Sequence, residues 1–264
     1  AEQIALIDEV QKLKSHYQTM QTLAEIRHSI DTRDGFYDTE NTFFDESNPF
    51  YIEMTNSFNK KLLASSFRKE LEKELGSHIF AMTELDMKVF SPSIMEDLAE
   101  ENKLTSSYDK LIASAEIEFA GEKRTLAQLT PFMQDQDRAT REKAAQAYYG
   151  FFAENEAEFD SIYDNLVKVR TRIAKKLGYK NFVQLGYDRM GRTDYNAEIV
   201  AAYRNQIYRE IVPIAADLRK RQAKRLGLKQ LYYYDEPLEY TTGNAIPHGN
   251  PDWILANAKK MYAE

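Results

Sequence analysis

The chain has 264 residues, 43% of them hydrophobic, and a formal net charge of −7 at pH 7. This length suits one large domain or two small ones with a sizeable core, and the acidic balance argues against nucleic acid as a main partner. The absence of cysteine excludes disulfides and thiolate metal ligands. No apolar run is long enough to cross a membrane, so no membrane contact is expected, and the first residues show no export signal.

The first ninety residues show the periodicity of amphipathic helices. Residues 3–30 form one such pattern, and Asp34-Gly35 marks a break after it. Asn48-Pro49 is typical of a helix start, with a cap followed by proline at the first helical position, so a new helix is expected from Tyr51 to Gly76. Ile79–Phe90 predicts a further helix, and Ser91-Pro92 predicts a restart by the same device.

One segment, near residues 112–129, interrupts the helical pattern. Its apolar and polar side chains alternate from Ser114 to Phe119, which is typical of a strand. Residues 120–123 suit a turn, and residues 124–129 suit a return strand ended by Pro131. We therefore expect one β-hairpin in an otherwise helical chain. Asp135 or Asp137 is expected to cap the next helix.

The longest regular stretch runs from Phe159 to Leu231. It predicts a helix that ends at Gly178, a glycine-marked connection, and a second helix that opens near Thr193 or Asp194 and closes at Gly227. The second helix would have roughly thirty residues and would need partners along its length. Pro213 lies inside it and predicts a kink.

The segment beyond Gly227 is rich in tyrosine, proline and glycine and predicts a long structured loop or short strands. Tyr233, Tyr234, Asp235 and His248 are its candidates for contact with a peptide, because a tyrosine ring offers an apolar surface and a hydrogen-bonding tip. The alternative, equally weighted for each tyrosine, is packing against the core. For His248, a structural role is the more common outcome. Pro251-Asp252 predicts a last helix.

No set of catalytic residues or metal ligands is visible in the sequence. The four histidines do not form the His-Glu-x-x-His pattern of zinc peptidases, and neither a Gly-x-Ser-x-Gly elbow nor a glycine-rich phosphate loop is present. The basic residues between Arg219 and Arg225 occupy the end of a helix, where its dipole favours cations. We therefore assign no catalytic residue and no metal ligand to this chain.

Four stretches together resemble one enzyme family. They are RHSIDTRDGFYDTENTFFDES, ENKLTSSYDKLIASAEIEFAGEKRTLAQLTPF, KVRTRIAKKLGYKNFVQLGYDRMGRTDYN and LYYYDEPLEYTTGNAIPHGNPDW. They are similar to the N-terminal half of the oligoendopeptidase F family, which comprises thimet-like zinc metallopeptidases, and most closely to its Pz-peptidase-like branch. The similarity extends over essentially the whole chain, in one order and without large gaps.

The resemblance implies a mainly α-helical, two-lobed fold around a channel in which zinc hydrolyses short peptides, usually in the cytoplasm. Residues 1–195 would form the N-terminal helical lobe, and residues 196–264 the first elements of the catalytic lobe. The family's zinc motif has no counterpart here, so we expect zinc in the full-length enzyme but none in this chain, and no activity of the chain alone. Its partners would be short peptide substrates and a C-terminal catalytic half that packs on an apolar patch along Ile199–Leu218 and around Trp253.

A second hypothesis comes from another class of protein. Amphipathic helices with one hairpin and no catalytic cluster also fit a helical interaction or scaffold module without catalysis of its own. A His-Glu-x-x-His motif encoded beyond Glu264 would favour the peptidase, and its absence would favour the scaffold.

Overall fold

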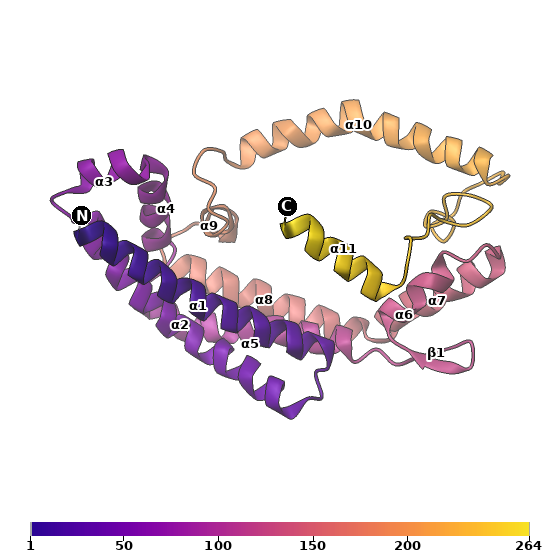
Figure 1. Cartoon of the computed structure of the whole chain (residues 1–264), viewed down its shortest axis with the longest axis horizontal. Coiled ribbons are helices and arrows are strands. Elements are labelled where there is room, and N and C mark those ends of the chain that lie inside the picture. Colours follow the sequence, from indigo (N-terminus) through magenta and orange to yellow (C-terminus); the bar gives the residue numbers. More distant parts are fainter. Residues whose placement is uncertain (1, 264) are drawn as a thin grey trace. The chain divides into compact units, whose positions relative to one another are not determined.

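The structure is a computed structural model that describes residues 2–263. It is mainly α-helical with one small antiparallel sheet, as predicted (Figure 1). Within the described residues the elements are α1 (Glu2–Ile30), α2 (Gly35–Leu63), α3 (Arg68–Leu75), α4 (Ser77–Lys88), η1 (Pro92–Ile94), α5 (Met95–Ala113), β1 (Ile117–Phe119), β2 (Glu122–Arg124), α6 (Leu126–Met133), α7 (Arg138–Glu154), α8 (Glu156–Lys176), α9 (Phe182–Arg189), α10 (Ala197–Arg225) and α11 (Pro251–Ala263). None of these helices is both long and apolar enough to span a membrane.

The chain divides into two compact units that each combine two stretches of sequence. Unit 1 contains the described residues up to Glu116 together with Phe152–Ile207. Unit 2 contains Ile117–Phe151 and the described residues from Tyr208 onward. These units differ from the expected lobes, 1–195 and 196–264, because α7 and α10 each contribute to both units. The assignment of the two lobes stays a prediction.

Unit 1 is a bundle in which α1, α2, α5 and α8 pack side by side (Figure 1). Its central cluster consists of side chains without solvent exposure from η1, α8 and α9, namely Ile94, Val169, Ile173, Ala174 and Leu185. Val169 and Ile173 lie four residues apart on α8, so they share one face of that helix. Ion pairs border the cluster: Arg170 Nε lies 2.7 Å from Glu101 Oε1, and Arg172 Nε lies 2.6 Å from Asp97 Oδ1.

Proline 49 lies inside α2, so the expected helix start at Asn48-Pro49 is wrong. Proline cannot donate the hydrogen bond that the Asp45 carbonyl would receive in a regular helix. Asn102 of α5 compensates, because its Nδ2 donates to Asp45 O at 3.2 Å. The packing of α2 against α1 and α5 thus allows one helix to continue through the proline.

The expected hairpin is present, and its turn is tighter than the sequence suggested. β1 and β2 pair antiparallel, with Ile117 opposite Arg124 and Phe119 opposite Glu122. Ala120 and Gly121 connect the strands with φ angles of 54° and 80°, the left-handed conformation that a two-residue type I′ turn requires.

The expected return strand over residues 124–129 is wrong beyond Arg124. Thr125 starts α6 instead, through a capping box in which Gln128 N donates to the Thr125 hydroxyl and Thr125 N donates to Gln128 Oε1. Pro131 lies inside this short helix.

The connection between the two longest helices of the second half contains a helix of its own, α9, which the sequence pattern did not indicate. Gly178 adopts a φ of 83° directly after α8, as expected for a helix C-terminus. The cap of α10 is Asn196, rather than Thr193 or Asp194, since Asn196 Oδ1 accepts hydrogen bonds from the amides of Glu198 and Ile199 at 3.1 Å.

Two helices carry apolar side chains that are about half exposed or more. On α10 these are Ile199, Tyr203, Tyr208, Ile211, Ile214 and Leu218, and on α11 they include Trp253, Leu255 and Met261. An exposed apolar stripe of this length is typical of a surface that another element covers.

Candidate functional site

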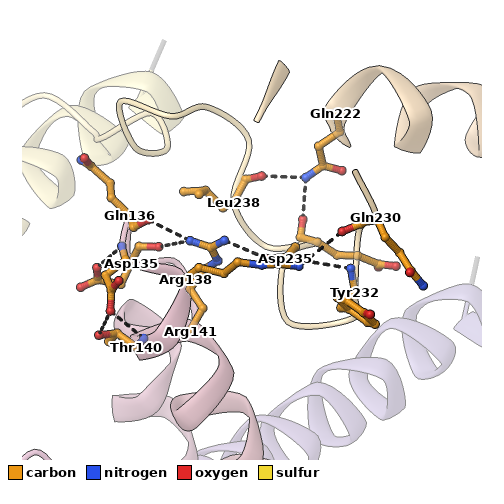
Figure 2. A network of polar contacts seen from close by, with 12 residues as sticks. Asp135, Gln136, Arg138, Thr140, Arg141, Gln222, Gln230, Tyr232, Asp235 and Leu238 are labelled. Atoms are coloured by element: carbon orange, nitrogen blue, oxygen red, sulfur yellow. Dashed lines mark hydrogen bonds and ion pairs between the residues drawn. The ribbon is translucent and has the colours of Figure 1, made fainter. Parts of the chain in front are cut away.

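The tyrosine-rich loop after α10 is built on a tight turn in unit 2 (Figure 2). The amide of Asp235 donates to the Tyr232 carbonyl at 2.9 Å, and the amide of Leu238 donates to the Asp235 carbonyl at 3.2 Å. The carboxylate of Asp235 also accepts from the amide of Tyr232 at 3.0 Å. Asp235 therefore organises the backbone around the tyrosines that were expected to contact a peptide.

Two arginines of α7 bind the same Asp235 carboxylate (Figure 2). Arg138 forms a two-pronged contact, with Nε 3.0 Å from Oδ1 and Nη2 2.8 Å from Oδ2. Arg141 adds a third contact, from Nη2 to Oδ1 at 2.8 Å. The Asp235 side chain has no solvent exposure, and only 3% of the Arg141 side chain is exposed. This is a buried, multiply hydrogen-bonded ion cluster, the form in which the attraction offsets the cost of desolvation.

The electrostatics keep Asp235 ionised. Burial would raise the pKa of its carboxyl group, but the hydrogen bonds from Arg138, the Tyr232 amide and Arg141 outweigh that effect and hold the pKa below its ordinary value. At neutral pH the carboxylate is therefore charged, and its two oxygens are occupied by donors of the chain itself.

Side chains of α7 and α10 also donate hydrogen bonds to backbone carbonyls near the Asp235 cluster. Arg141 Nη1 donates to the carbonyls of Asp135 and Gln136 at 2.8 and 3.0 Å, which holds the segment before α7. The side chain of Gln222 on α10, only 2% exposed, donates to the carbonyls of Glu236 and Leu238 at 3.0 and 2.7 Å (Figure 2). The loop backbone is thus hydrogen-bonded to α10 through Gln222 and to α7 through Arg138, whose Nη2 donates to the Gln230 carbonyl at 3.3 Å.

The tyrosine rings form a cluster on this frame. Tyr232 and Tyr234 stack with ring centroids 5.5 Å apart, and the Arg138 guanidinium lies 5.4 and 5.5 Å from the two ring centres. Tyr233 packs edge-on against Tyr149 of α7 at 5.6 Å and is half exposed. The rings are oriented by aromatic and cation–π contacts, and part of their surface remains open to solvent.

The structure brings together three of the four residues that the sequence singled out. Tyr233, Tyr234 and Asp235 lie in one turn, whereas His248 is an exposed residue of the segment that leads to α11. The contact of these four residues with substrate stays a prediction. Asp235 would act on substrate binding indirectly, by positioning the loop, since its carboxylate is enclosed by Arg138 and Arg141.

Sequence reasoning missed Arg138, Arg141 and Gln222. The two arginines lie 97 and 94 residues from Asp235 along the chain. Their spacing of three on one helix face is a common surface pattern, so nothing in the local sequence indicates a buried carboxylate partner.

The histidines do not converge on a metal site. His16, His78 and His248 are exposed, and buried His28 contacts Asp38, with Nε2 3.2 Å from Oδ1. Within residues 2–263 no group of three or more histidine, aspartate or glutamate side chains is placed to hold a metal ion. The described residues therefore do not fit the zinc site that the resemblance implies, and we derive no reaction step through zinc in this chain.

Family models of known proteins match two long parts of the chain. The model of the peptidase M3 N-terminal domain matches residues 1–90, and the model of peptidase family M3 matches residues 131–243. The two matches follow each other along the chain without overlap. The chain belongs to peptidase family M3.

Within this family, the chain is similar to solved structures of the oligoendopeptidase F group. PZ peptidase A in complex with an inhibitor shares 52% identity and a TM-score of 0.94, with 99% of this chain and 47% of that chain covered. A candidate oligoendopeptidase F from Bacillus anthracis str. Ames shares 52% identity and a TM-score of 0.92, with 99% and 48% covered. A further candidate oligoendopeptidase F shares 51% identity and a TM-score of 0.94, with 99% and 46% covered.

These similarities confirm the resemblance to the oligoendopeptidase F family and its PZ-peptidase-like members. The chain spans about half the length of the solved structures that it matches. Among curated protein sequences, no match was found.

Proposed function

We propose that this chain is the N-terminal, helical part of a zinc metallo-oligoendopeptidase that hydrolyses short peptides inside a helical channel in the cytoplasm. The observation that carries the proposal is the similarity along 99% of the chain to PZ peptidase A at 52% identity. The zinc and its ligands would come from the remainder of the whole enzyme. Residues 1–195 would form the N-terminal lobe and residues 196–264 the beginning of the catalytic lobe.

In this proposal the chain selects substrates by size and binds the peptide, and it does not itself cleave the peptide bond. Helical walls over a buried site exclude folded proteins and admit extended peptides. Tyr233 and Tyr234 would contact the peptide backbone with their rings and hydroxyl groups, and His248 would add a polar contact. Asp235 would act through the loop, because its bonds to Arg138 and Arg141 set the position of the tyrosines.

The exposed apolar faces of α10 and α11 fit the same proposal, since they would pack against the catalytic half. They would equally serve a helical scaffold module without catalysis. The two hypotheses differ in one expected result. If the chain is part of a peptidase, joining it to the remaining part of the protein should give peptide cleavage, whereas a scaffold module should give none.

Peptide cleavage tests the proposal in two steps. The 264-residue chain alone should not cleave a quenched fluorescent oligopeptide above the buffer rate, because its described residues form no metal site. The same chain joined to the remainder of its coding sequence should cleave it, and a zinc chelator should abolish the activity. Chelator-sensitive cleavage by the 264-residue chain would reveal a site within it, and an inactive joined protein would favour the scaffold.

A further inference from the structure

Unit 1 contains a polar pocket whose lining residues take no part in the tyrosine-rich loop. It has a volume of about 510 Å³ and lies between α4, α9 and the segment that leads into α10. Five of its lining residues carry charge: Glu84, Lys88, Asp188, Arg192 and Asp194. A pocket of this size is large enough for the end of a small peptide.

Most of these charges are already paired within unit 1. Asp188 is buried and accepts from Lys88 Nζ at 2.7 Å, from the Tyr179 hydroxyl at 2.6 Å and from Gln184 Nε2 at 2.7 Å. Glu84 is bound by Arg68, with Nη2 2.7 Å from Oε1. The carboxylates of Asp188 and Glu84 are therefore satisfied by cations and donors of the chain.

Arg192 differs from Lys88, the other cation that lines the pocket. Its guanidinium lies over the rings of Tyr187 and Tyr195, 5.0 and 5.2 Å from their centres. The side chain is half-buried, and within residues 2–263 it takes part in no ion pair with a carboxylate. Stacking on aromatic rings fixes the plane of a guanidinium while its N–H edge remains able to donate.

The remaining charges around Arg192 set what the pocket can accept. Lys88 lies on α4 and Asp188 on α9, and their charges offset each other. Asp194 is exposed in the segment before α10, so it adds negative charge at a solvent-facing position. One planar, singly charged anion with an apolar or amide body suits this environment, whereas a multiply charged anion would be repelled more strongly by the exposed carboxylate of Asp194.

We propose that this pocket binds the terminal carboxylate of a short peptide, with Arg192 as the group that recognises it. The inference rests on the proposed function for its substrate class. A guanidinium offers two parallel N–H donors to a carboxylate, which gives both strength and orientation. Because Tyr187 and Tyr195 already hold Arg192 in place, little conformational entropy is lost when the anion binds.

Equilibrium binding to the 264-residue chain tests the pocket without any turnover. Three probes are compared. The first is N-acetyl-Ala-Ala with a free terminal carboxylate, and the second is its C-terminal amide. The third is N-acetyl-glutamate α-amide, which carries only a side-chain carboxylate. NMR titrations should follow the arginine Nε–H signals and the backbone amides near Arg192. The free acid should shift these signals in a saturable way, and the C-terminal amide should not.

Variants separate Arg192 from a general effect of charge. Arg192→Gln should weaken binding of the free acid about tenfold or more, since a charge-assisted pair is lost. Arg192→Lys should retain part of it, because the charge remains without the two-pronged geometry. Arg204→Gln removes the same charge from an exposed position on α10 within unit 1 and should leave binding unchanged.

Several results would overturn the inference. Equal binding of acid and C-terminal amide would show that the carboxylate is not recognised, and equal binding of the side-chain acid would show that its terminal position is not. Equal binding of inorganic phosphate would show a general anion site. Unchanged binding by Arg192→Gln with an unperturbed amide spectrum would exclude Arg192. None of these results bears on cleavage by the joined enzyme, so failure here is distinguishable from failure of the proposed function.

Discussion

Replacing Asp235 by asparagine is expected to destabilise unit 2 by about 3–5 kcal/mol, the usual cost of removing one partner from a buried ion pair. The carboxylate has no solvent exposure and holds two guanidinium groups, of which that of Arg141 is almost fully buried. Asparagine has nearly the same shape, so the loss would come from the uncompensated charge of Arg141. Hydrogen exchange of the amides in α7 and in residues 231–238 measures the effect locally.

Asp217→Asn is a matched control on α10 in the same unit. Asp217 is exposed and lies 3.9 Å from Arg221, one turn away on the same helix. A pair of this kind contributes little in water, so this variant should exchange like the parent protein. Similar exchange rates in the Asp235 and Asp217 variants would contradict a structural role of the Asp235 cluster.

The same cluster predicts a pH dependence of stability with a definite sign. The pKa of Asp235 is lower in the folded chain than its unfolded value of about 3.9. Stability from this group is therefore fully present above about pH 5 and is lost as pH falls through the lower folded pKa. In urea titrations between pH 3 and pH 6, Asp235→Asn should reduce this acid-side loss relative to the parent chain.

The second large effect is expected in unit 1, at Ile173 of α8. Ile173→Ala should lower the free energy of unfolding by about 2–5 kcal/mol, through lost burial and the cavity left behind. The side chain has no solvent exposure and packs in the cluster with Ile94, Val169 and Leu185. Urea unfolding followed by circular dichroism, with hydrogen exchange to locate the change, measures it.

Val167→Ala tests whether the loss is specific to the buried face of α8. Val167 is 46% exposed on the same helix, and alanine favours a helix more than valine does. This variant should therefore be as stable as the parent chain or slightly more stable. A comparable loss for the two variants would contradict the position of Ile173 in the core.

Much of the fold could be predicted because its signals are local. The helical periodicity of α1, α8 and α10, the glycine after α8 and the alternation of β1 each depend on residues close in sequence. One error arose where a distant contact decides. Asn102 of α5 satisfies the carbonyl that Pro49 leaves without a donor, so α2 continues where the sequence indicated a start.

The candidate site was less predictable for the same physical reason. The tyrosine-rich composition indicated Tyr233, Tyr234 and Asp235 as candidates, but the arginine partners of Asp235 lie more than ninety residues earlier. Nothing in the local sequence distinguishes Arg192 from other surface arginines. Its distinction comes from the two rings that orient it, the pocket that it lines and the carboxylates nearby that are already paired with other cations.

Metal analysis of the purified 264-residue chain tests most directly whether the catalytic metal belongs to another part of the enzyme. After equilibration with zinc and gel filtration, the chain should retain far less than one equivalent, because its histidines and carboxylates form no cluster of metal ligands within residues 2–263. Retention of one tightly bound zinc per chain, lost on mutation of His248 or another histidine, would contradict that proposal.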